Sequence, residues 1–166
     1  MNRALLPSLT GAPPDVTIEW TSPLKEANFA EYRDEAFLSA LGLAHLSQQL
    51  VGNFWPRGGP CWDALAIVRS PTDPAFHGVI LVEAKSHTPE IYGTGCQARE
   101  PSLTRIRRAL SLTAEALATT ATAPWESRLY QTANRLAHLH FLPIADGVSR
   151  IVPSHLRRRH ASEARK

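Results

Sequence analysis

The stretch Gly78-Val-Ile-Leu-Val-Glu-Ala-Lys85 predicts a strand at the centre of a sheet. Residues 79–82 are apolar without interruption, and continuous apolarity is typical of a strand buried on both faces. A second apolar run, Cys61-Trp-Asp-Ala-Leu-Ala-Ile-Val68, precedes it, and the Pro-containing loop 70–74 lies between the two. The simplest pairing of two runs so close in sequence is an antiparallel hairpin.

Helix-forming sequence lies on both sides of this strand pair. Ser22 is suited to be an N-cap, Pro23 to follow it at the first helical position, and Gly42 to end the same helix. Farther along the chain, apolar residues recur at steps of three and four. The sequence therefore predicts helices at residues 24–41, 43–51, 102–118 and 125–142.

These elements predict one domain of mixed α/β (α+β) class, with helices covering a small sheet. A chain of 166 residues with 43% apolar residues fits a single domain with one core. We expect an extended lead-in at 1–21, the domain at 22–152 and a basic tail at 153–166. Residues 148–152 either supply a last short strand or leave the sheet truncated, because Pro153 follows them.

The positive net charge belongs to the end of the chain. Six of the 18 Lys and Arg residues and one of the 15 acids lie in 150–166, so the remainder holds 12 bases and 14 acids, a net charge of −2. The expected domain therefore does not have the basic charge of a nucleic-acid-binding surface, and the tail is typical of a solvated segment.

The sequence gives no sign of a membrane or secretory protein. It has no apolar run of the ~18 residues that a spanning helix needs, and its N-terminus lacks the apolar core of a signal peptide. Cys61 and Cys96 are too few for a disulfide framework and lack metal-binding spacing. We expect a soluble protein of the reducing cytoplasm.

Three charged residues are placed for chemistry at the strand ends. Glu83 and Lys85 point to the same face of their strand, and Asp63 ends the neighbouring strand. Charge at the end of a buried strand is costly unless it is paired or binds a metal. One interpretation is a Glu83–Lys85 ion pair. The other is a Mg²⁺ site, because the carboxylate of Asp63 adds negative charge that Lys85 does not neutralise. Lys85 would then act on a water molecule and on a phosphoryl group.

Pro60-Cys-Trp-Asp63 followed by Glu83-Ala84-Lys85 resembles the motif of the PD-(D/E)XK nuclease superfamily, with the proline displaced from the aspartate. The resemblance covers about residues 24–142 and implies a restriction-endonuclease-like α-β-β-β-α-β core. It implies that Asp63, Glu83 and the Ala84 carbonyl bind Mg²⁺, for which Mn²⁺ can substitute, while Lys85 activates water. The superfamily's last strand corresponds to the short stretch 148–152.

The resemblance also indicates accessory residues. A glutamate of the first helix often joins the site; Glu31 and Glu35 would share one helix face, and Glu35, which is followed by apolar residues, is the better candidate. Gln131 loosely matches a glutamine found in one subgroup. His87 and Glu90 follow Lys85 closely, and each is either an accessory site residue or an ordinary loop residue.

Other conspicuous side chains have simpler interpretations. Cys61 is expected to fill space, because no His/Asn pattern accompanies it as a nucleophile would require. Trp55 and Trp62 favour core packing over base stacking. His138 and His140 lie about 200° apart on a helix, so they cannot share a metal.

The sequence thus predicts a Mg²⁺-dependent phosphodiesterase acting on DNA, or alternatively on RNA. The second hypothesis is an inactive nuclease-fold module for interaction or assembly, which the acidic body and the weak last strand favour. A truncated sheet edge would also favour a homodimer. A hydrolase of phosphorylated small molecules is the third hypothesis, but no Gly-rich phosphate loop supports it.

Overall fold

The computed structural model describes residues 9, 12–119, 125–142 and 149–154. Their fold is built on a four-stranded sheet of order β1-β2-β3-β4, in which β1–β2 and β2–β3 are antiparallel and β3–β4 is parallel. The predicted hairpin and the mixed α/β class are therefore confirmed. The strands are β1 (Thr17–Ser22), β2 (Ala64–Arg69), β3 (His77–Ala84) and β4 (Ser149–Ser154).

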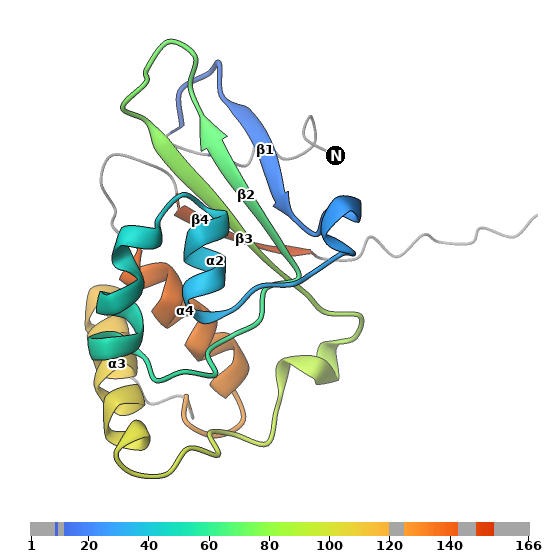
Figure 1. The fold of residues 1–166 in the computed structure, drawn as a ribbon. Helices are drawn as coiled ribbons and strands as arrows, with labels where there is room; N and C mark the ends of the chain where they lie inside the picture. Colours follow the sequence, from blue (N-terminus) through green and yellow to red (C-terminus); the bar gives the residue numbers. More distant parts are fainter. Residues whose placement is uncertain (1–8, 10–11, 120–124, 143–148, 155–166) are drawn as a thin grey trace, which may run out of the picture.

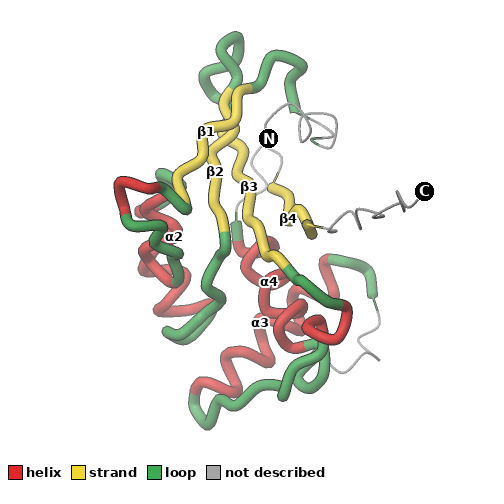
Figure 2. The backbone as a smooth tube through the Cα atoms, turned by 90° about the vertical axis from the view of Figure 1, so that its right-hand side faces the viewer, coloured by secondary structure: helices red, strands yellow, loops and turns green. Residues whose placement is uncertain are grey.

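The helices gather on one side of this sheet, while the turn from β2 to β3 extends beyond them (Figures 1 and 2). The opposite end of β2 and β3, which carries the predicted site, lies close to the helices. No helix of the described chain is both long and apolar enough to cross a membrane. The main helices are α2 (Asp34–Ala40), α3 (Ser102–Ala116) and α4 (Tyr130–Phe141), and the short ones are η2 (Lys25–Ala27), η3 (Ala44–Leu46), η4 (Gln49–Phe54) and η5 (Thr88–Ile91).

The N-terminal third differs most from the prediction. Residues 17–21, expected in an extended lead-in, form β1 together with Ser22, and β1 pairs with β2. The predicted helix 24–41 is broken: η2 is a single turn, and α2 begins only at Asp34. Ser22 does not cap a helix, because its hydroxyl donates to the Ala30 carbonyl at 2.9 Å. Asn28 and Phe29 have φ of 53° and 57°, and such left-handed residues cannot continue a right-handed helix.

The C-terminal strand completes the sheet. β4 pairs with β3 along its whole length, from Val79 opposite Ser149 to Ala84 opposite Ser154. The sheet is thus not truncated after β3, and Pro153 is accommodated within the strand. Residues 155–166 of the predicted basic tail lie outside the described residues.

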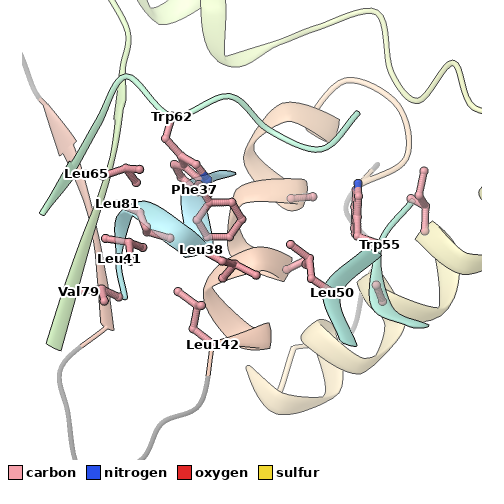
Figure 3. Packing of buried hydrophobic residues seen from close by; sticks show 14 of the residues in the cluster. Phe37, Leu38, Leu41, Leu50, Trp55, Trp62, Leu65, Val79, Leu81 and Leu142 are labelled. Atoms are coloured by element: carbon pink, nitrogen blue, oxygen red, sulfur yellow. The ribbon is translucent and has the colours of Figure 1, made fainter. Parts of the chain in front are cut away.

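Strand β3 is apolar throughout because both of its faces are covered. Val79 and Leu81 belong to the core beneath the helices, whereas Ile80 packs on the other face with residues of the N-terminal segment. Figure 3 shows Leu65 and Leu81 beside Phe37, Leu38 and Trp62 in the helix-covered core. The predicted burial of the central strand is confirmed.

Aromatic rings and a histidine fill the centre of this core. Trp55 and Trp62 are buried, as core packing predicts. The ring of His138 lies 4.9 Å from that of Trp55 and 6.1 Å from that of Phe37. Its Nδ1 is 2.8 Å from the Asn134 carbonyl, and its Nε2 has no hydrogen-bond partner among the described residues. His138 is therefore a core residue of α4.

Truncating the centre of β3 should destabilise the fold strongly. Leu81→Ala removes a fully buried side chain and leaves a cavity, so the free energy of unfolding should fall by about 2–5 kcal/mol. Leu117→Ala, at a side chain that is 53% exposed, should change it by less than about 0.5 kcal/mol. Urea unfolding monitored by circular dichroism measures both; equal effects would contradict the core assignment.

The burial of His138 should make stability depend on pH. Burial lowers the pKa of His138 to about 4, with a smaller contribution from Arg135, although Asp34 and the Asn134 carbonyl act in the opposite direction. The unfolded chain, with a histidine pKa of about 6.5, binds that proton more tightly, so stability is lost as pH falls below about 6.5. Wild type should lose about 2 kcal/mol more than His138→Gln between pH 7 and pH 5.

Urea unfolding at the two pH values measures this difference. His45→Gln, at an exposed histidine, is the matched control and should behave as wild type. An identical pH dependence in His138→Gln and wild type would contradict the burial of a neutral imidazole.

Candidate active site

The site is built where β2 begins and β3 ends. The pairing of Ala64 with Val82 places Asp63 opposite Glu83. The Asp63 N–H donates to the Val82 carbonyl at 3.1 Å, and the Ala84 N–H donates to Asp63 Oδ2 at 2.5 Å. These two hydrogen bonds fix Asp63 against the end of β3.

Side-chain alternation places the predicted residues on the helix-covered face. Leu65 and Leu81 belong to the core beneath the helices, and Asp63 and Glu83 each lie two residues farther toward the end of the sheet. Lys85 follows Glu83 by two residues and forms an ion pair with it, from Nζ to Oε1 at 2.5 Å. The structure thus brings Asp63, Glu83 and Lys85 together.

Arg135 of α4 adds a second cation to this group. Its Nε and Nη2 contact Glu83 Oε2 at 3.0 and 2.9 Å, and the Arg135 and Glu83 side chains are each only 14% exposed. Both oxygens of Glu83 are therefore engaged by cations. The two carboxylates of Asp63 and Glu83 are balanced in charge by Lys85 and Arg135. Of these two cations, only Lys85 was assigned to the site from the sequence.

Two further residues of α4 orient these cations. Gln131 Oε1 accepts a hydrogen bond from Lys85 Nζ at 3.3 Å, and Asn134 Oδ1 accepts one from Arg135 Nη1 at 2.9 Å. Gln131 and Arg135 are four residues apart, so they share a helix face. The structure therefore places Gln131 beside Lys85, and the same spacing is the signal by which Arg135 could have been found.

Glu35 has no described contact with this group; its partner is Arg57. Glu35 is in the first turn of α2 and forms an ion pair with Arg57, one Arg57 nitrogen lying 2.9 Å from Glu35 Oε2. Glu31 precedes the helix, and its Oε2 is 3.8 Å from the Cys61 sulfur, so the two glutamates do not share a helix face. In the described part of the chain, no three His, Cys, Asp or Glu side chains gather as metal ligands would.

The residues after Lys85 form a turn that leads into η5. Glu90 Oε2 accepts a hydrogen bond from the Ser86 N–H at 3.1 Å, which fixes the turn into η5. His87 is exposed and precedes η5. Neither side chain has a described contact with Asp63, Glu83 or Lys85.

The oxygen atoms gathered here suit a hard cation, provided that the cation can compete for Glu83. The carboxylates of Asp63 and Glu83 and the Ala84 carbonyl supply only oxygen, which Mg²⁺ prefers. Asp63 Oδ1 accepts no hydrogen bond from the described residues, whereas both oxygens of Glu83 are ion-paired. A metal at Glu83 would therefore have to compete with Arg135.

Comparison of the chain with protein-family models, curated proteins and solved structures found no match. The function is therefore inferred from the residues at the end of β2 and β3 and from those that α4 adds to them.

The Glu83–Arg135 pair should be strongly coupled. Because both side chains are mostly buried, a double-mutant cycle with Glu83→Gln and Arg135→Met should give a coupling free energy above about 1 kcal/mol. The exposed pair Arg107–Glu126, at 2.8 Å, is the matched control and should give about 0–1 kcal/mol. Chemical unfolding measures both cycles, and similar values would contradict a special role for Arg135.

Proposed function

We propose that this protein is a Mg²⁺-dependent phosphodiesterase that cleaves DNA, with a site of the PD-(D/E)XK type. The observation that carries the proposal is the gathering of Asp63, Glu83 and Lys85 at one sheet end, with Gln131 bonded to Lys85. These groups come from the ends of two strands and from a helix, which are distant in sequence. Surface charges that pair by chance would not be expected to gather on one face in this way.

The topology supports a restriction-endonuclease-like core. Three antiparallel strands are followed by helices α3 and α4 and then by β4, parallel to β3. This order corresponds to the β-β-β-α-β part of the core. One difference is that α2 lies between β1 and β2 instead of preceding the first strand.

Each residue has a defined role in the proposed reaction. Asp63, Glu83 and the Ala84 carbonyl would hold Mg²⁺ or Mn²⁺; when bound, the metal supplies positive charge at the phosphate and makes a bound water more acidic. The Lys85 ammonium, oriented by Glu83 and Gln131, is placed to hold the attacking water and to stabilise charge on the phosphoryl oxygens. The water loses a proton as its oxygen bonds to phosphorus, while one ester P–O bond breaks and the leaving sugar oxygen takes up a proton to depart as an alcohol.

Plasmid nicking with Mg²⁺ or Mn²⁺ tests this function. Lys85→Ala should lower the rate at least about 100-fold, because it removes the group that positions the water and stabilises charge. Lys25→Ala, at an exposed lysine of η2, is the matched control and should retain wild-type activity. Nicking that survives Lys85→Ala, or that is lost equally in both variants, would remove the proposed mechanism.

A second candidate function is a nuclease-fold interaction or assembly module without catalysis. The observation that favours it is the charge balance at Glu83, whose two oxygens are already paired with Lys85 and Arg135. In that case the polar group would stabilise the end of the sheet, and no metal would be needed.

Metal-dependent stability separates the two candidates. A ligand that binds only the folded state stabilises it by about 2.7 kcal/mol at 100 times its Kd, which raises Tm by several degrees in a protein of this size. Millimolar Mg²⁺ should therefore raise the Tm of wild type but not that of Asp63→Asn. No shift in wild type would favour the non-catalytic module.

A further inference from the structure

The segment that follows η5 is fixed against the start of α4. The Gly93 N–H donates to the Arg128 carbonyl at 3.0 Å, and the Cys96 N–H donates to the Glu126 carbonyl at 2.8 Å. Gly95 has φ of +85°, and a Cβ there would lie 3.0 Å from both the Glu126 carbonyl oxygen and the Ser127 Cα. The close approach therefore requires glycine, and it holds residues 92–96 in a defined position.

This segment presents an aromatic ring next to a guanidinium group. The Arg128 guanidinium carbon lies 4.8 Å from the centroid of the Tyr92 ring, a distance typical of a cation–π contact. The Tyr92 side chain is nevertheless 50% exposed. Arg128 is also exposed and forms no ion pair with another described residue. A half-exposed ring, with the guanidinium over one of its faces, and a positive charge without an ion-pair partner among the described residues are thus presented together to solvent.

The Tyr92–Arg128 pair is adjacent to the candidate active site. Gly93, the next residue, faces Gln131: a Cβ at Gly93 would lie 3.6 Å from Gln131 Cγ. Gln131 in turn accepts the hydrogen bond from Lys85. Figure 1 shows the chain leaving the end of β3 through η5 and passing the start of α4. Tyr92 is therefore the neighbour in sequence of a glycine that faces Gln131, the hydrogen-bond partner of Lys85.

We propose that Tyr92 and Arg128 form a platform on which an unpaired base of single-stranded DNA stacks. Bases stack on exposed aromatic rings whatever their identity, and arginine complements the neighbouring phosphate. The base faces of a duplex are covered by their neighbours, so this platform discriminates in favour of single strands. The inference rests on the proposed function, because it assigns the substrate that reaches Lys85.

The chemistry of the pair favours nucleic acid over a protein partner. Ile91, the neighbouring apolar side chain, is 36% exposed, and the pair itself carries a full positive charge. A protein interface of ordinary size needs a far larger contiguous surface, whereas one base needs only one ring face.

Fluorescence anisotropy of a labelled oligothymidine in EDTA tests the platform without any cleavage. Tyr92→Ala should weaken binding about ten- to a hundredfold, in line with the energy of one stacked base, whereas Tyr92→Phe should bind within about twofold of wild type. Tyr92→Leu keeps apolar bulk but lacks the ring face, and it should bind as weakly as Tyr92→Ala. Unlabelled duplex should compete at least tenfold less well than single strand.

Control variants keep the test specific. Arg69→Ala removes one positive charge at the far end of β2, and Leu117→Ala removes exposed apolar surface from the region after α3; both should bind like wild type. Retained binding in Tyr92→Ala would overturn the proposal. Equal competition by duplex would overturn it because it indicates attraction by charge alone, and tight binding by Tyr92→Leu would do so because it indicates an apolar docking surface.

Different experimental results would refute this inference and the proposed function. Nicking that depends on Lys85 together with unchanged binding by Tyr92→Ala would remove the platform alone. Nicking that survives Lys85→Ala would remove the catalytic function and, with it, the assignment of the platform to a cleavage substrate.

Discussion

Strand β3 ends with a carboxylate that the fold has to neutralise. Its apolar residues are covered on both faces, so the chain reaches Glu83 while still close to the core. A mostly buried carboxylate is tolerable only with compensating charge. Lys85 supplies one part from just beyond the end of β3, and Arg135 supplies the other from α4. The position of α4 against the sheet end is therefore coupled to the ion pair between Glu83 and Arg135.

This coupling explains why the two candidate functions share one geometry. With Arg135 on Glu83, the group is neutral and acts as a structural contact between sheet and helix. In the proposed metal-bound state, a divalent cation at Asp63 and Glu83 would displace Arg135 from Glu83 and would leave it available to an anionic phosphate. Under this proposal the same side chains would serve stability in one state and substrate binding in the other, and the affinity for metal would decide between the two states.

Short-range patterns predicted the centre of the molecule well. The apolar run before Glu83, the alternation of Glu83 and Lys85, and the pairing of the two strands all depend on neighbours in sequence. Gln131 was predicted only through a resemblance, and the structure places it at Lys85. Arg135 was not assigned to the site because its partner Glu83 lies 52 positions earlier in the chain. The local signal was only its four-residue spacing from Gln131, which places both side chains on one helix face. The prediction of a continuous helix from residue 24 was wrong. The left-handed residues Asn28 and Phe29 separate η2 from α2, although this part of the sequence is rich in helix formers.

The central claim is that Asp63 and Glu83 hold a divalent cation in place of the ion pair with Arg135. The most direct measurement is a crystal structure of the protein with Mn²⁺, located by its anomalous scattering. The account predicts a peak within bonding distance of a carboxylate oxygen from both Asp63 and Glu83, with the Arg135 guanidinium displaced from Glu83. An intact Glu83–Arg135 pair and no peak between the two carboxylates at millimolar Mn²⁺ would contradict it.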